Sequence, residues 1–156
     1  MTIRTVLLAP VPAIHLASTL ELLNLSERVA FGSSKRGIDK LPIGIDVFIY
    51  ATDQRHALFR KGVASWTGVL ESIVPAVQRG PRSGKHPDRT VRPASAEETD
   101  GPFMNFWEVF GLRQLPSNAY VPLAAFRKPG RQRVKAFPGD VPEWPVMAEL
   151  VSDCAP

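Results

Sequence analysis

The 15 prolines in this chain of 156 residues restrict its fold more than any other feature of the sequence. Proline fixes φ and lacks a backbone N–H, so it interrupts helices and is tolerated in strands only at edges, ends or bulges. The proline content is about twice the usual share. We therefore expect many short strands with irregular connections, and an all-helical bundle is disfavoured.

The length and the single cysteine set further limits. A chain of this size buries roughly two thirds of its unfolded surface around one core, so we expect one domain over residues 1–156. Cys154 has no second cysteine with which to form an internal disulfide or a cysteine-based zinc site, which suits a reducing cytoplasm. The apolar N-terminal run contains prolines and follows only Arg4, unlike a signal peptide or a membrane span. We expect a cytoplasmic protein without membrane contact.

The formal charge of +4 is modest, but positive charge is concentrated in two segments. Residues 79–92 carry five cations against Asp88 alone, and residues 127–135 carry five cations and no acid. Such segments attract a polyanion by releasing its counterions, and nucleic acid is the commonest polyanion. A solvated loop and tail explain the same pattern equally well. The candidate phosphate-binding residues are Lys35, Arg36, Arg82, Lys85, Arg131, Arg133 and Lys135.

Hydrophobic patterning predicts strands and short helices, and hence an α+β fold. Strands are expected over 2–10, 45–51, 103–115 and 119–126, and one bent strand or two over 56–77, with bulges at Gly62 and Gly68. Leucines at helical spacing predict a helix within 15–31. Ser18 or Thr19 is its expected N-cap, and Glu21 would complete a capping box with Ser18. A last helix is expected within 141–151, with Pro145 in its first turn.

Residues 78–102 are predicted to form a long connection. They are rich in Gly, Pro, Ser and charge and have almost no apolar residue, so burial cannot offset the entropy of ordering them. We expect a mobile loop, of a length that is unusual in a compact domain unless it serves a ligand. A basic extension over 127–156 is expected to follow the last core segment.

Signatures of an enzyme are weak. The three histidines lack metal-ligand spacing, and the chain has no complete phosphate loop, dinucleotide fingerprint or nucleophile elbow. We therefore expect no metal and no cofactor. Lys40 or Lys61 could perform acid–base chemistry with Thr67 and Glu71, although such triplets are common by chance. Catalysis is the weaker alternative.

The stretch Phe-Gly-Ser-Ser-Lys-Arg at residues 31–36 predicts a turn that binds a ligand. Small residues let a ligand approach the backbone, two serines offer hydroxyls to a base edge, and the two cations offer charge to phosphate. A base taken out of its stack is held by aromatic faces, although core packing is the commoner use of each ring. Trp66 is the best such ring, because its small neighbours leave a hollow. The predicted base pocket comprises Phe31, Gly32, Ser33, Ser34, Tyr50 and Trp66.

The order of these parts resembles the PUA-like superfamily, in particular its EVE and YTH branches. The resemblance rests on RTVLLAP, TLELLNL, GSSKRGIDKL and IGIDVFIYAT, followed by KGVASWTGVLESIV and FWEVFGLRQLPSNAYVPLAAF. It covers residues 3–127 and implies a small, curved, mixed β-barrel of five or six strands flanked by short helices. It also implies a pocket for one modified base. The YTH tryptophan before the small-residue turn is replaced here by Phe31.

These features favour a non-catalytic module that binds RNA or DNA and holds a modified or flipped base in an aromatic-lined pocket. Two alternatives stay open. The related ASCH branch implies a small hydrolase that acts on a modified nucleoside. The other alternative is a domain that binds a protein or a small ligand and whose positive charge is incidental.

Overall fold

The computed structural model describes residues 2–52, 62–80, 83–97, 103–129 and 144–152, and these form an α+β fold in which strands dominate. The strands are β1 (Thr2–Pro12), β2 (Arg28–Ser33), β3 (Asp46–Thr52), β4 (Val63–Pro75), β5 (Asn105–Gln114), β6 (Val121–Pro122), β7 (Phe126–Arg127) and β8 (Val146–Ser152). One α-helix, α1 (Ala13–Leu22), occurs among the described residues. The 3-10 turns are η1 (Ile38–Lys40), η3 (Arg89–Val91), η4 (Ala94–Glu97), η5 (Ser117–Ala119) and η6 (Leu123–Ala125).

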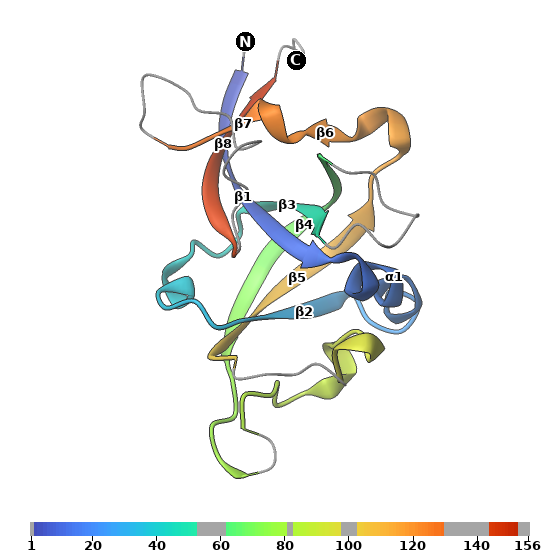
Figure 1. Ribbon diagram of the computed structural model, residues 1–156, viewed down its shortest axis with the longest axis vertical. Coiled ribbons are helices and arrows are strands. Elements are labelled where there is room, and N and C mark those ends of the chain that lie inside the picture. Colours follow the sequence, from blue (N-terminus) through green and yellow to red (C-terminus); the bar gives the residue numbers. More distant parts are fainter. Residues whose placement is uncertain (1, 53–61, 81–82, 98–102, 130–143, 153–156) are drawn as a thin grey trace.

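The strands make one mixed sheet in the order β2-β5-β4-β3-β1-β8-β7, and β6 pairs with β4 outside this path (Figure 1). β1 and β3 are parallel, while the other pairs are antiparallel. Among the described residues, the path runs from β2 to β7 without closing. The α+β class is thus confirmed, but the sheet has eight strands instead of five or six, and a barrel is not confirmed.

Apolar residues cover both faces of the inner strands. Alternate residues of β1 enter different clusters: Leu7, Ala9 and Val11 join one, and Val6 and Leu8 join the other. β3 divides in the same way, which explains why its sequence is apolar nearly throughout. The strand expected over residues 2–10 is present as β1, an inner strand between β3 and β8.

The long apolar segment before residue 78 forms one bent strand, β4 (Figure 1). Its register against β5 shifts between Thr67 and Val69, so the predicted bulge at Gly68 is confirmed. A Cβ on Gly68 would lie 2.5 Å from Val109 Cγ1 and 3.1 Å from the Phe110 carbonyl oxygen. Position 68 therefore requires a glycine, because any larger residue would collide with β5 at this bend. Gly62 precedes the strand at φ +78°.

The predicted last helix is wrong, because the described residues after Pro145 form β8. Met, Ala, Glu and Leu are good helix formers, but Ala148 and Leu150 also alternate as buried residues of a strand. β8 pairs with residues Thr2 to Leu8 along an edge of β1 that would otherwise lack backbone partners. Tertiary pairing thus overrides helix propensity here.

The predicted helix is present, but its predicted cap is wrong. α1 starts at Ala13, directly after Pro12, so Ser18 and Thr19 lie inside it. The Thr19 hydroxyl donates to the His15 carbonyl at 2.7 Å, and Ser18 Oγ accepts from the Ser95 N–H at 3.1 Å. The Thr19 side chain thus bonds within the helix, and the Ser18 side chain bonds to η4. Neither of them caps the start of α1.

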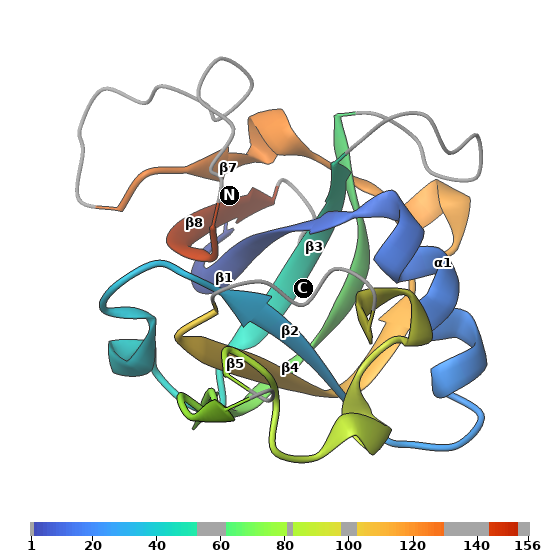
Figure 2. The ribbon, with the colours of Figure 1, turned by 60° about the horizontal axis from the view of Figure 1, so that its bottom comes forward.

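The segment 83–97 is more closely packed than its composition predicts. His86, Val91, Arg92 and Ala96 are buried, and Val91 joins a cluster with Ala30, Ala76 and Phe106. The segment lies beside β2 and reaches α1 (Figure 2). The expectation of almost no apolar anchor is therefore wrong, because two small apolar side chains and two buried polar ones attach the segment. Its mobility stays a prediction.

Candidate ligand cleft

Two adjoining cavities open where the C-terminal end of β1 passes β2 and the start of β5. The inner cavity has a volume of about 440 Å³ and the outer one about 350 Å³. Both are lined by Pro10, Gly32, Phe103 and Trp107, so we treat them as one cleft. The inner cavity is completed by Val11, Pro12, His15, Phe31, Thr52 and Arg92. The outer cavity is completed by Ser33, Ser34, Lys35, Trp144 and Pro145.

Strand pairing positions the aromatic floor of the cleft. In the β2–β5 register Phe31 lies opposite Trp107, and their ring centroids are 4.8 Å apart at 39°. Both rings are almost fully buried, at 4% and 1% exposure. They form the buried apolar floor of the cleft, whereas Phe103 and Trp144 are more exposed.

Gly32 sets how closely Phe103 approaches β2. A Cβ at this position would lie 2.5 Å from Phe103 Cδ2, well inside contact distance. Because Gly32 has no side chain, the Phe103 ring lies directly against the strand and forms one wall of both cavities. Gly32 was predicted to admit a ligand to the backbone, and here it admits a protein ring beside the cleft.

Arg92 brings a buried cation to the inner cavity. Its Nη1 donates to the Ala30 carbonyl at 2.7 Å, and its guanidinium lies 4.8 Å from the Phe106 ring centroid. The centroid of the Phe103 ring lies 5.9 Å from the same guanidinium. A strand carbonyl and two aromatic faces therefore hold the group in place.

The outer cavity is polar on one side. Ser33 is a buried residue of β2, and its Oγ accepts from the Lys35 N–H at 3.2 Å. Lys35 Nζ lies 4.2 Å from the Trp144 ring centroid, a cation–π contact across the cavity. Neither cavity is lined by an Asp or Glu among the described residues, so the cleft favours a ligand with acceptors or negative charge.

Five of the predicted site residues line this cleft: Phe31, Gly32, Ser33, Ser34 and Lys35. They do not form one turn, however, because Phe31, Gly32 and Ser33 belong to β2. Arg36 is exposed beyond the lining residues, and Lys85 forms an isolated bridge with Val77. Arg82, Arg131, Arg133 and Lys135 lie outside the described residues.

Trp66 and Tyr50, the predicted pocket wall, do not line either cavity of the cleft. Trp66 is fully buried in the cluster of Leu7 and Ile49, whereas Tyr50 belongs to the cluster on the other side of β3. Burial raises the pKa of the Tyr50 hydroxyl far above its ordinary value. The small neighbours of Trp66 reflect close strand packing, since Gly68 lies against β5.

Sequence reasoning missed Arg92, Phe103 and Trp144 as members of the site. Arg92 counted only as one of several cations in its segment, and Phe103 and Trp144 lie two residues before β5 and β8. Their approach depends on contacts between segments far apart in the chain. Trp107 was not among the predicted pocket residues either, and alternation in β5 places it on the face opposite Phe106.

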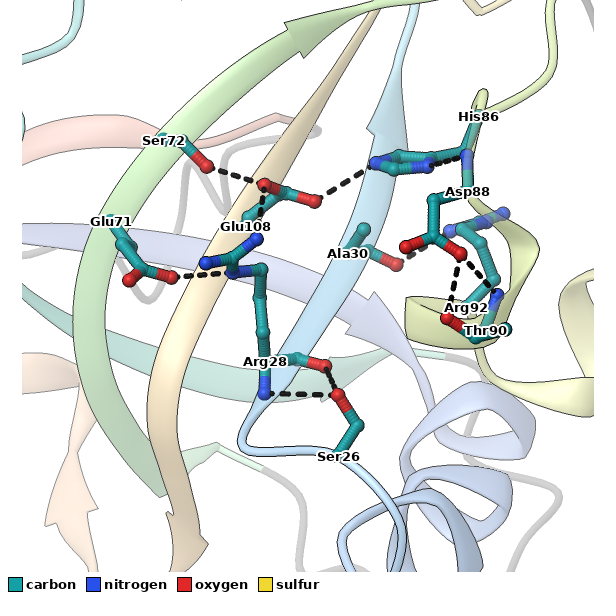
Figure 3. Close-up of polar contacts among 10 residues, drawn as sticks. All are labelled: Ser26, Arg28, Ala30, Glu71, Ser72, His86, Asp88, Thr90, Arg92 and Glu108. Atoms are coloured by element: carbon teal, nitrogen blue, oxygen red, sulfur yellow. Dashed lines mark hydrogen bonds and ion pairs between the residues drawn. The ribbon is translucent and has the colours of Figure 1, made fainter.

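A second polar group lies under the segment 83–97, on the other face of β5 from Trp107 (Figure 3). The buried Glu108 carboxylate accepts hydrogen bonds from Ser72 Oγ and, at 2.9 Å, from His86 Nε2. His86 Nδ1 accepts from the Asp88 N–H at 2.8 Å. These partners fix the imidazole proton on Nε2, because Nδ1 already faces a donor.

This arrangement does not resemble a hydrolytic triad. Ser72 donates to Glu108 instead of to His86, and both ring nitrogens of His86 are engaged by other groups. His86 is therefore not placed to take the Ser72 proton as a general base. The group ties the segment 83–97 to β4 and β5.

Charged groups at the rim of this cluster have shifted pKa values. A hydrogen bond from the Arg28 side chain to Glu71, at 2.6 Å, raises the pKa of Arg28. The Thr90 hydroxyl and N–H both donate to Asp88 and lower the pKa of that carboxyl. Asp88 thereby caps η3, next to Arg92.

The structure does not bring together the acid–base set considered from the sequence. The Thr67 hydroxyl donates to the Val47 carbonyl at 2.9 Å, and Glu71 pairs with Arg28. Lys61 lies outside the described residues, and Lys40 is exposed on η1. Within the described ranges, no group of three His, Cys, Asp or Glu side chains is placed to hold a metal.

No family model matches the chain, and no curated protein matches it. In the part of the chain that the structure describes, no helix has both the length and the apolar character that crossing a membrane requires.

Proposed function

We propose that this protein is a non-catalytic nucleic-acid binding module that holds one flipped or modified base in the cleft. The observation that carries the proposal is the continuity of two unlike surfaces. An apolar cavity floored by Phe31 and Trp107 opens directly into a polar cavity lined by Ser33, Ser34 and Lys35. A nucleotide has the same two parts, a flat apolar base and a charged backbone.

The size of the cleft supports this assignment. The inner cavity, at about 440 Å³, lies within the roughly 300 to 1,000 Å³ typical of sites for small organic ligands. A base is held by stacking on aromatic rings, and Phe103 and Trp144 are the cleft's partly exposed rings. A flipped base would lie over the buried floor beside Phe103, and Trp144 in the outer cavity would stack on the neighbouring base of the strand.

Charge supports a nucleic acid over an uncharged ligand. Lys35 lines the outer cavity, and Arg36 follows it at the exposed surface. Cations at this point would meet the phosphates on either side of a flipped base, since phosphate contacts position a strand and base contacts specify it. The net charge of +4 and a pI near 9.6 agree with such a partner.

Membership of the PUA-like superfamily, with a sheet curved into a barrel, is part of this proposal. The mixed sheet, the bend of β4 and the helix that follows β1 support it. The cleft would differ from the pocket that the resemblance implies, because Trp107, Phe103 and Trp144 would serve where Tyr50 and Trp66 were expected.

The test replaces the most exposed ring of the cleft. Trp144 is 38% exposed, so Trp144→Ala should leave the melting temperature close to that of the wild type. Loss of one stacking ring should weaken binding of a single-stranded oligonucleotide about 5-fold to 150-fold, from about 1–3 kcal/mol per stacked base. Fluorescence anisotropy with labelled RNA and DNA oligonucleotides measures this change.

Phe110→Ala is the matched control. Phe110 is an aromatic residue of similar exposure, 43%, on β5 outside both cavities. The proposal expects unchanged oligonucleotide affinity for this variant. Equal losses in the two variants, or unaltered binding by Trp144→Ala, would contradict a base site in the cleft.

A further inference from the structure

We infer that the main chain of Gly32 binds the edge of the base through two hydrogen bonds, one donated by its N–H and one accepted by its carbonyl. The inference rests on the proposed function, since it states how the same cleft would recognise its base. It comes from the hydrogen bonds along β2, the strand at one end of the sheet, and from the position of Gly32 on the wall of both cavities.

The pairing of β2 with β5 determines which way the Gly32 main chain faces. In an antiparallel pair, opposite residues alternate between hydrogen-bonded and non-hydrogen-bonded pairs. The Gly111 N–H donates to the Glu27 carbonyl at 3.1 Å, and the regular register then makes the odd-numbered residues of β2 the bonded ones. The N–H and C=O groups of Arg28, Ala30 and Gly32 therefore point away from β5, along the outer edge of β2.

Side chains satisfy this outer edge as far as Ala30. The Ser26 hydroxyl accepts from the Arg28 N–H at 3.2 Å and donates to the Arg28 carbonyl at 2.8 Å. Arg92 Nη1 donates to the Ala30 carbonyl at 2.7 Å. Among the residues that the structure describes, none bonds to the N–H or the C=O of Gly32. Gly32 thus offers one main-chain donor beside one main-chain acceptor.

The two rings beside Gly32 show that the inner cavity reaches this edge. Successive residues of a strand point to opposite faces, and the Cβ direction of Gly32 points at the Phe103 ring. Phe31 points to the other face, where its ring lies against Trp107. Phe31 and Phe103 both line the inner cavity, and β5 covers the inner edge of β2, so the cavity extends past the outer edge. A planar ligand bonded there would have an aromatic ring on each side.

One free donor and acceptor pair suits a base better than an added peptide strand. A peptide that extends a sheet bonds along a run of edge residues, whereas Arg28 and the Ala30 carbonyl are already engaged. A base offers a donor beside an acceptor on a single edge. In thymine and uracil the donor is N3–H beside O2 and O4, and in cytosine it is N4–H beside N3. These groups form the Watson–Crick edge, so the cleft requires an unpaired base, and a pyrimidine must keep that edge unmodified.

The first experiment uses the intact protein and short single-stranded oligonucleotides whose flanking residues carry difluorotoluene, which copies the shape of thymine without its strong donors and acceptors. The central residue is thymine, N3-methylthymine or difluorotoluene. Thymine should bind about 5-fold to 150-fold more tightly than difluorotoluene, as expected for two neutral hydrogen bonds. N3-methylthymine has no N–H donor and should bind less tightly than thymine. Equal affinities for thymine and difluorotoluene would overturn the inference.

Amide exchange measured by NMR then locates the contact without a substitution, since Gly32→Ala would bring a Cβ within 2.5 Å of Phe103. In the free protein the Gly32 N–H should exchange faster than the Phe31 N–H, which faces β5. The thymine oligonucleotide should slow exchange of the Gly32 N–H, and the difluorotoluene one should not. The Gly111 N–H, already bonded to Glu27, is the matched control and should exchange equally in both complexes. Equal exchange of the Gly32 N–H in both complexes would also overturn the inference.

The two proposals fail in different ways. If thymine and difluorotoluene bind equally and both depend on Trp144, the Gly32 inference fails and the base site stands. If binding of every oligonucleotide is independent of Trp144, the base site fails, and the Gly32 inference fails with it.

Discussion

At the scale of single residues, Trp66 and Trp107 illustrate how similar side chains acquire different roles. Both are almost fully buried, but Trp66 packs among core residues and Trp107 also lines the cleft. Small neighbours around Trp66 predicted a hollow, and in the folded chain strand β5 fills that space at Gly68. An aromatic residue beside small residues therefore marks a pocket only if no other strand packs there.

A core position for Trp66 has a measurable consequence. Trp66→Ala should lower the free energy of unfolding by roughly 3–5 kcal/mol, because a large side chain leaves a cavity that its neighbours fill only in part. Urea unfolding followed by circular dichroism measures the change. Val69→Ala, at a partly exposed position of the same strand, should cost much less. Near-normal stability of Trp66→Ala with lost oligonucleotide binding would restore Trp66 as a pocket wall.

At the scale of elements, the segment 83–97 depends on β4 and β5. His86 reaches the Glu108 carboxylate on β5, and Ser72 of β4 donates to the same carboxylate (Figure 3). The segment in turn carries Arg92 to the inner cavity. The polar composition of this segment predicted an unpacked loop, but one of its polar residues, His86, attaches it to the sheet.

We expect this buried group to matter more than a surface ion pair. Glu108→Ala leaves the buried His86 Nε2–H without its acceptor and should cost about 1–3 kcal/mol of unfolding free energy, as an unsatisfied buried donor does. Asp46→Ala removes an exposed pair with Arg4, at 2.9 Å, and should cost about 0–1 kcal/mol. Denaturant unfolding of both variants measures the difference. Similar small losses would show that the Glu108 group does not stabilise the fold.

At the scale of the whole molecule, the cleft and most of the clustered positive charge belong to different residues of the chain. The cleft is built by β1, β2, β5 and the segment 83–97. Many of the clustered cations, including Arg131, Arg133 and Lys135, lie outside the described residues. Because Arg131, Arg133 and Lys135 are not among the residues of the proposed base site, substitutions can test this predicted phosphate grip separately from the base site.

Replacing Arg131, Arg133 and Lys135 together with Ala should flatten the dependence of oligonucleotide affinity on salt. Removing one cation that binds a phosphate lowers the slope of log affinity against log salt by about one. Base preference should be unaffected, because phosphate contacts position the strand and base contacts specify it. Lys40→Ala with Arg113→Ala, two exposed cations outside the cleft, is the control. An unaltered slope for the triple variant would exclude this segment as the grip.

Elements with a local signal could be predicted from the amino-acid sequence. Continuous apolar runs marked β1 and β3, alternation marked β5, leucine spacing marked α1, and Gly68 marked the bulge of β4. Phe31 to Lys35, which were predicted as site residues from their own chemistry, line the cleft. In each case the residue types within one segment are enough, because they report burial and backbone conformation directly.

The remaining features depend on tertiary contacts. β8 is a strand because the edge of β1 needed backbone partners, although its residues also favour a helix. Phe103 became a wall of the cleft because Gly32, on another strand, has no side chain to exclude its ring. Arg92 reached the cavity because the Ala30 carbonyl and the Phe106 ring hold it there. Contacts of this kind join residues far apart in the chain, so no local pattern of the sequence encodes them.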